Sequence, residues 1–188
     1  MRAAVIGGGP AGLIFAISMK LRDPAHEVAV VERNRPDDTF GWGVVLSDET
    51  LDNLHENDPV SAADIRRNFA YWDDIAVHYR GTLQRSGGHG FCGIGRRTLL
   101  NILQDRARDL GVDLRFEEEI DDLDRWQDFD VVVAADGVNS KVRAALASMF
   151  KPDIDVRACK YIWLGTKQTF TNAFTFIFEE TRHGWIWV

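Results

Sequence analysis

Apolar residues in the first part of the chain form two runs that flank a glycine-rich turn and a helical pattern. The first run covers residues 3–6 and leads into Gly7–Gly12, after which apolar residues recur at helical spacing as far as Leu21. The second run covers residues 28–31. Apolar runs without alternation are typical of strands buried on both faces of a parallel sheet, so the pattern predicts a strand, a turn, a helix and a second strand.

The middle of the chain mixes strand and helix patterns. Alternating apolar and polar residues within 75–94, interrupted by glycines, predict strands joined by tight turns. Apolar runs predict two further strands at 112–116 and 129–135, and the acidic stretch Glu117–Asp124 between them predicts a solvated loop. Helical spacing predicts helices at residues 48–57, 64–69, 96–110 and 140–147.

The pattern changes again after Pro152, where aromatic residues become frequent. Three aromatic-rich segments predict strands of a second sheet, at residues 161–164, 174–178 and 185–188. We therefore expect a first domain at 1–157, with strands within about 71–95 joining the second sheet, and an incomplete β-rich domain at 158–188. A chain that stops inside an apolar strand leaves an unpaired edge, so we also expect a truncation at Val188.

Composition and charge exclude several classes of protein. The 188 residues include 22 basic and 29 acidic side chains, a formal net charge of −7, and no basic stripe that would suit a nucleic acid. Two cysteines cannot form a disulfide framework, and no spacing predicts a metal site. With only two cysteines, we expect a reducing, cytoplasmic location. No membrane span and no signal peptide is evident.

The glycine turn has the spacing of a dinucleotide-binding motif. Gly7, Gly9 and Gly12 would let a pyrophosphate approach the positive end of the following helix, and Pro10 suits the first helical turn. Glu32 lies twenty residues beyond Gly12 and just after the second strand, where its carboxylate can accept hydrogen bonds from both ribose hydroxyls. Because a 2′-phosphate would be repelled there, FAD or NAD is favoured over NADP. The alternative is a turn that only packs the helix on the sheet.

A second acidic position follows the apolar run that ends at Ala135. Asp136-Gly137 would lie at the carboxyl ends of the parallel strands, where open α/β sheets bind ligands. An aspartate there can reach a cofactor sugar, although an ordinary Asp-Gly turn is the alternative.

Three segments in the same order along the chain resemble the single-component FAD-dependent aromatic hydroxylases, the p-hydroxybenzoate hydroxylase-like monooxygenases. These segments are Gly7–Gly12 with Glu32-Arg33, Arg96–Leu99, and Asp136–Arg143. Four further segments are similar to the amino-terminal parts of salicylyl-CoA 5-hydroxylases and 2-aminobenzoyl-CoA monooxygenases, namely residues 31–36, 40–47, 86–91 and 161–166. The violacein-pathway hydroxylases are similar over the same segments.

The resemblance implies a fold, a cofactor and a reaction. The expected fold is α/β, a Rossmann-like FAD-binding βαβ domain with a mostly parallel sheet, followed by the beginning of a β-rich substrate domain. The expected cofactor is FAD, with NADH or NADPH as transient electron donor. The expected reaction is hydroxylation of an aromatic ring, with O₂ and an aromatic CoA thioester as substrates. The flavin would carry out most of the chemistry, so no catalytic side chain and no metal is assigned.

The resemblance also implies a set of cofactor-binding residues. Glu32 would contact the adenosine ribose, Arg96 the region of the phosphates, and Asp136 the ribityl or pyrophosphate region. Many relatives carry an arginine near position 42, where this chain has Trp42, and the family's Gly-Asp signature would lie beyond Val188. The full set is Gly7, Gly9, Pro10, Ala11, Gly12, Glu32, Arg33, Trp42, Gly43, Arg96, Asp136 and Gly137.

Two other functions use the same residues. An NAD-dependent dehydrogenase could use the same glycine turn, but the Asp136 segment and the strands within 75–94 count against it. A truncated, non-catalytic FAD-binding module is the second alternative. Of the histidines, only His89, in a glycine-rich turn between strands, is a candidate for proton transfer, and a structural role of that turn is the alternative.

Trp163 belongs to a group of aromatic residues that either line a pocket or simply pack a sheet.

Overall fold

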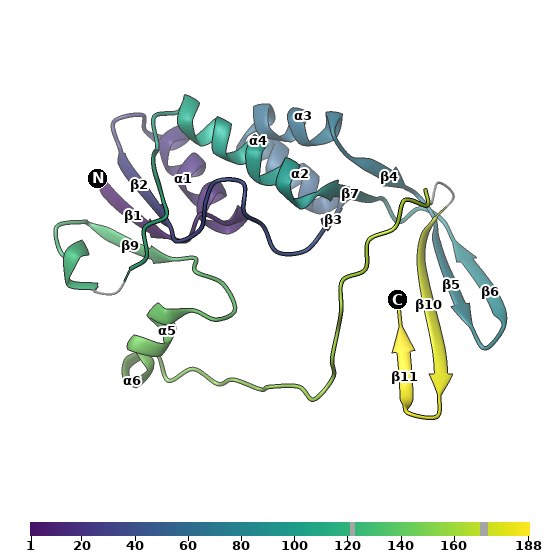
Figure 1. Cartoon of the computed structure of the whole chain (residues 1–188). Coiled ribbons are helices and arrows are strands. Elements are labelled where there is room, and N and C mark those ends of the chain that lie inside the picture. Colours follow the sequence, from purple (N-terminus) through teal and green to yellow (C-terminus); the bar gives the residue numbers. More distant parts are fainter. Residues whose placement is uncertain (121–122, 170–172) are drawn as a thin grey trace.

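The computed structural model describes residues 1–120, 123–169 and 173–188, and its central element is a four-stranded parallel sheet (Figure 1). The strands follow the order β8 (Asp113–Phe116), β2 (Glu27–Glu32), β1 (Arg2–Ile6) and β9 (Val131–Ala134). All three pairings between them are parallel. The sheet thus places the carboxyl ends of β1, β2 and β9 side by side, as the predicted strand–helix–strand unit requires.

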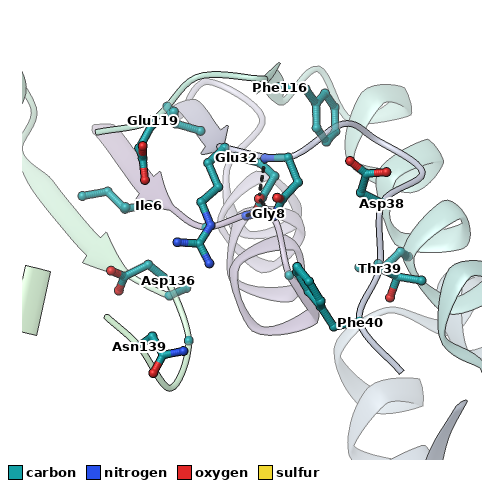
Figure 2. A pocket seen from close by; sticks show the side chains of 18 of the residues that line it. Ile6, Gly8, Glu32, Asp38, Thr39, Phe40, Phe116, Glu119, Asp136 and Asn139 are labelled. Atoms are coloured by element: carbon teal, nitrogen blue, oxygen red, sulfur yellow. Dashed lines mark hydrogen bonds between the residues drawn. The ribbon is translucent and has the colours of Figure 1, made fainter. Parts of the chain in front are cut away.

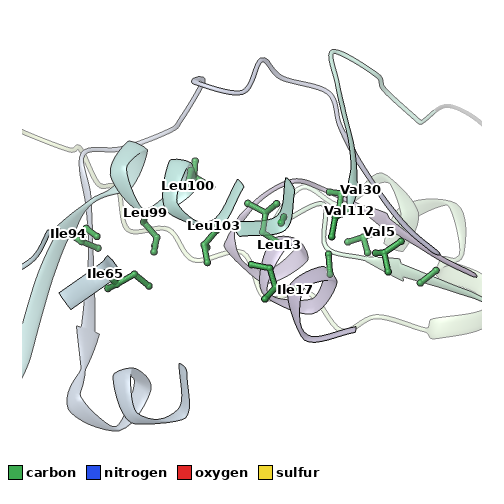
Figure 3. Packing of buried hydrophobic residues seen from close by; sticks show 14 of the residues in the cluster. Val5, Leu13, Ile17, Val30, Ile65, Ile94, Leu99, Leu100, Leu103 and Val112 are labelled. Atoms are coloured by element: carbon green, nitrogen blue, oxygen red, sulfur yellow. The ribbon is translucent and has the colours of Figure 1, made fainter. Parts of the chain in front are cut away.

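Two helices cover one face of this sheet, α1 (Pro10–Arg22) and α4 (Arg96–Asp109). Successive strand residues point to opposite faces, so Val5 and Val30 join the large core against the helices, while Ala4 and Val31 face Trp126 on the other side. Figure 3 shows the side chains of α1 and α4 meeting over the sheet. Burial on both faces explains why β1 and β2 have no polar alternation. Trp126 itself ends the short 3₁₀ helix Leu123–Trp126.

Two more helices extend the helical layer, α2 (Asp48–Asn57) and α3 (Pro59–Arg67). The Ser47 hydroxyl caps α2 by accepting a hydrogen bond from the backbone N–H of Thr50 at 3.3 Å. The predicted helix at 64–69 is wrong in its bounds, because α3 begins with Pro59 in its first turn, before the apolar spacing becomes visible. The predicted helix at 140–147 is divided into α5 (Lys141–Ala145) and α6 (Ala147–Phe150).

The alternating stretch at 75–94 divides between two further sheets. One sheet is antiparallel, with the order β3 (Gly43–Ser47), β7 (Phe91–Gly95) and β4 (Ala70–Trp72). The other has the order β11 (Gly184–Trp187), β10 (Phe174–Thr181), β5 (Ile75–Tyr79) and β6 (Thr82–Ser86). In Figure 1 the yellow β10 lies beside the teal β5, to which it pairs in parallel. Segments far apart in the sequence therefore form one sheet.

The predicted strand at 161–164 is wrong. These residues have no strand pairing in the structure, and they belong to the extended segment 151–169 that follows α6 (Figure 1). Strand propensity is a local property, but a strand also needs a partner, and here Trp163 and the following Gly165 instead contact residues 41–42. The predicted acidic loop at 117–124 includes residues 121–122, which lie outside the described residues. Among the helices of the described ranges, none is both long and apolar enough to cross a membrane.

Candidate functional site

The glycine turn between β1 and α1 is shaped by close backbone packing. Gly7 has φ +111°, and a Cβ there would collide with the carbonyl of Ala135 at the end of β9. A Cβ at Gly12 would collide with the Gly7 carbonyl. Gly9 differs from both, because an added Cβ would meet no atom within 4 Å. Gly7 and Gly12 thus hold strands and helix together, while Gly9 faces open space in front of the amino terminus of α1.

That open space belongs to a cavity of about 740 Å³ at the carboxyl ends of the parallel strands (Figure 2). Its walls come from the ends of β1, β2 and β9, from the loop that follows β2, and from α4. Eight of the predicted cofactor-binding residues line it: Gly7, Gly9, Pro10, Glu32, Arg33, Arg96, Asp136 and Gly137. A cavity of this size and place fits the crevice in which open α/β sheets bind nucleotides.

Glu32 is held in a fixed orientation at the end of β2. Its Oε2 accepts a hydrogen bond from the backbone N–H of Gly8 at 2.8 Å, drawn as the dashed line in Figure 2. Its Oε1 accepts two hydrogen bonds from Asn34, from the backbone N–H at 2.9 Å and from Nδ2 at 2.6 Å. A carboxylate has about four lone-pair sites and three are used here, so the oriented side chain can still accept about one hydrogen bond from a ligand. Asn34 is a supporting residue that the sequence did not indicate.

Asp136 follows β9 and faces the same cavity. Its Oδ2 accepts hydrogen bonds from the backbone N–H groups of Lys141 at 2.7 Å and Val142 at 3.3 Å, at the start of α5. Burial by itself would raise the pKa of Asp136, but hydrogen bonds from Ser140 and from these backbone groups outweigh it and lower the pKa. Asp136 therefore carries a negative charge at neutral pH.

Charged side chains on the loops around the cavity pair with one another. Lys141 Nζ lies 2.6 Å from Glu119 Oε1, and this hydrogen bond is the main cause that lowers the pKa of Glu119. Arg35 Nε lies 3.4 Å from Glu117 Oε1. Arg33, Arg35, Arg96 and Lys141 all line the cavity, and two of these four cations, Arg35 and Lys141, are already paired with carboxylates.

Two polar residues of the cavity wall complete the site, and neither was indicated by the sequence. The Thr39 Oγ1 atom is buried and has no hydrogen-bond partner among the described residues, while other atoms of Thr39 line the cavity. Gln104 is buried, and its Nε2 donates to the carbonyl of Pro36 at 2.9 Å, which holds the loop after β2 on α4. Gln104 follows Arg96 and Leu100 in steps of four along one face of α4, a spacing that could have identified it.

Four residues of the predicted set do not line the cavity. Gly12 packs the turn, and Ala11 lies exposed on α1. Trp42 packs its ring against Gly165, and Gly43 lies close to the carbonyl of Ile94. His89 is also absent from the cavity wall, and its Nε2 lies 2.7 Å from the Ser86 hydroxyl in the turn before β7.

Residues 1–130 match the model of a protein family described as FAD binding domain. The chain belongs to this FAD-binding domain family. The matched residues include the glycine turn, Glu32 and all of α4. Many residues of the cavity wall lie within the matched range, and the open Gly9 and the basic side chains of the wall suit a group that carries a pyrophosphate.

Curated relatives of this FAD-binding domain include several monooxygenases. The chain is 46% identical over 184 residues to salicyloyl-CoA 5-hydroxylase from Streptomyces sp., which covers 98% of this chain and 35% of that protein. It is 37% identical to protodeoxyviolaceinate monooxygenase from Chromobacterium violaceum, over 90% of this chain and 46% of that protein. It is 33% identical to 3-hydroxy-4-methyl-anthranilyl-[aryl-carrier protein] 5-monooxygenase from Streptosporangium sibiricum, over 98% of this chain and 51% of that protein. The chain thus spans about a third to a half of the length of these relatives.

Solved structures show the same fold. A variant of MHPCO, 2-methyl-3-hydroxypyridine-5-carboxylic acid oxygenase, superposes with a TM-score of 0.68 and 28% sequence identity, over 77% of this chain and 42% of that one. The predicted Rossmann-like α/β fold is confirmed, and so is the predicted family.

Proposed function

We propose that the cavity binds FAD and that the chain forms the cofactor-binding part of a flavin-dependent aromatic monooxygenase. The observation that carries this proposal is the meeting of Glu32, Asp136 and the open amino terminus of α1 at Gly9 in one cavity. Glu32 would accept hydrogen bonds from the adenosine ribose, and the α1 amino terminus would face the pyrophosphate. Arg33 and Arg96 would neutralise phosphate charge, and Asp136 with Gly137 would contact the ribityl or pyrophosphate region.

The proposed reaction is hydroxylation of an aromatic ring that is carried as a CoA thioester. When bound, FAD would supply the redox chemistry, taking electrons from NADH or NADPH and activating O₂ for transfer of one oxygen atom to the ring. The residues of this chain would bind and orient the cofactor and keep water out of the cavity. The names of two relatives, one acting on salicyloyl-CoA and one on an anthranilyl-carrier protein, support a thioester substrate.

The proposal includes a division of the chain. Residues 1–157 would form the FAD-binding domain, and 158–188 would begin the substrate-binding domain, with strands from within about 71–95 in its sheet. The pairing of β10 with β5 supports this division. Both cysteines, Cys92 and Cys159, are free thiols, which supports the proposed cytoplasmic location.

Cofactor binding is tested by titrating the purified chain with FAD and, separately, with NAD, using calorimetry and the visible flavin spectrum. We expect a yellow complex with FAD, and about a tenfold or greater loss of FAD affinity in Glu32→Gln, because a charged hydrogen-bond acceptor is removed. Glu49→Gln, at an exposed position in the first turn of α2, is the matched control. Binding of NAD but not FAD would instead establish the dehydrogenase alternative.

Activity is tested on the protein as the cell makes it. We expect salicylyl-CoA or 2-aminobenzoyl-CoA to stimulate the oxidation of NADH or NADPH, with a hydroxylated thioester detected by mass spectrometry. FAD binding without stimulated oxidation by any aromatic thioester would leave a non-catalytic flavin-binding module.

A further inference from the structure

Two segments far apart in the sequence meet through reciprocal contacts between tryptophan and glycine. A Cβ added to Gly41 would lie 3.4 Å from the ring of Trp163. A Cβ added to Gly165 would lie 3.2 Å from the ring of Trp42. Each tryptophan therefore covers the glycine of the other segment. We refer to Gly41, Trp42, Trp163 and Gly165 as the tryptophan clamp.

The two glycines let the facing rings lie close to the backbone. Gly41 has φ +82°, a conformation that residues with a Cβ rarely adopt, and a larger residue at Gly165 would displace the Trp42 ring. The backbone carbonyl of Trp42 also accepts a hydrogen bond from the N–H of Arg96 at 3.1 Å. The clamp thus holds the connection at residues 163–165 against residues 41–42, which are hydrogen-bonded to the start of α4.

The fixed connection carries two aromatic rings to the cavity. Tyr161 and Trp163 pack edge to face, with ring centroids 5.3 Å apart, and both line the cavity beside Phe40. The three residues remain 77%, 59% and 65% exposed, in that order, so they form a wall with free ring surface. Glu32 and Gly9 line the same cavity from the ends of β2 and β1, so a ligand held there could reach the aromatic wall.

We propose that the tryptophan clamp holds Tyr161 and Trp163 as the aromatic wall against which the isoalloxazine ring of FAD packs, an inference that rests on the proposed function. Aromatic side chains favour packing against planar rings, and two rings held in place lose little freedom when a ligand arrives. Tyr161 and Trp163 are binding residues in this proposal. Trp42 does not line the cavity and is a positioning residue that acts through Gly165.

The test compares FAD with ADP, which has the adenosine and the pyrophosphate but no isoalloxazine ring. Affinities are measured by calorimetry for the unchanged chain, for Trp163→Leu, and for Gly165→Val, which breaks the clamp without removing an aromatic ring. We expect each substitution to weaken FAD binding about three- to tenfold while ADP affinity changes less than twofold. FAD should also quench less tryptophan fluorescence in Trp163→Leu than in the unchanged chain.

The matched control is Trp187→Leu on β11, whose ring is exposed and does not line the cavity. Circular dichroism and melting temperature show whether each variant is folded. Unchanged FAD affinity in both clamp variants overturns the proposal, and so does an equal loss of FAD and ADP affinity, since that reflects general damage to the cavity. If the unchanged chain binds neither FAD nor ADP, the proposed function itself is wrong.

Discussion

The parallel sheet and the sheet that contains β10 are both built from regular strand pairs, but they differ in how far they are buried. Four of the five residues of β1 are buried, whereas every residue of β6 and β11 is exposed. The parallel sheet is covered by α1 and α4, and its core continues through them. Backbone pairing alone therefore arranges strands, while the packing of side chains between layers supplies most of the stabilisation.

The difference is sharpest for ion pairs. Arg106 donates two hydrogen bonds to the buried Asp58, from Nε at 2.9 Å and from Nη2 at 3.0 Å, and so joins α4 to the start of α3. Arg80, in the turn after β5, and Glu180 on β10 form an exposed pair at 3.0 Å. We expect Arg106→Ala to lower the free energy of unfolding by about 3–5 kcal/mol, because the buried Asp58 carboxylate loses the cation that pairs with it.

Urea unfolding of both arginine variants tests this expectation. Arg80→Ala is the control, and we expect it to cost about 0–1 kcal/mol, as exposed ion pairs do. Equal losses in the two variants would show that burial does not distinguish the two regions.

Leucines allow the same comparison with apolar side chains. Leu103 on α4 is 1% exposed in the core against α1, and Leu83 on β6 is 52% exposed. We expect Leu103→Ala to cost about 2–5 kcal/mol, because a cavity remains in the core. Leu83→Ala should cost less than about 0.5 kcal/mol. Chemical denaturation measures both values. A larger loss of stability for Leu83→Ala would mean that Leu83 on β6 is more buried than the structure shows.

The same contrast explains which parts of the fold were predictable from the sequence. The β1–α1–β2 unit was predicted because each of its signals is local: apolar runs, a glycine turn and helical spacing. The strand predicted at 161–164 is wrong because an apolar aromatic run looks the same whether or not another strand is there to pair with it. The start of α3 was missed because its first turn begins with Pro59 and contributes little apolar spacing.

The candidate site was predicted to a similar extent. Gly9, Glu32 and Asp136 were identifiable because each lies within a few residues of the end of an apolar run in the sequence. Thr39 and Gln104 were not, since their places in the cavity wall depend on how the loop after β2 lies on α4. The tryptophan clamp could not be predicted, because it depends on contact between residues 41–42 and 163–165. The sequence showed only that both segments contain aromatic residues.

Acid should weaken the buried ion pair selectively. Burial alone would raise the pKa of Asp58, but hydrogen bonds from Arg106 and Ser61 outweigh it and lower the pKa. A carboxyl with a lowered pKa stabilises the fold above its unfolded pKa, which is about 3.9, and loses this contribution as the pH falls through the lower folded pKa. We expect the stability difference between the unchanged protein and Asp58→Asn to shrink between pH 6 and pH 3, measured by thermal unfolding. A difference independent of pH would contradict a charged Asp58 in the folded state.

The smallest effect is expected for Gln104, which links the core to the wall of the candidate site. Gln104→Leu removes the buried hydrogen bond to the carbonyl of Pro36 and should cost about 1 kcal/mol of stability. Because that bond holds the loop carrying Arg35 and Thr39, the variant should also bind FAD more weakly than its small loss of stability suggests. Calorimetry with FAD measures this, with Gln84→Leu on the exposed β6 as the control. If both variants bind FAD equally well, the loop after β2 keeps its position without the hydrogen bond from Gln104.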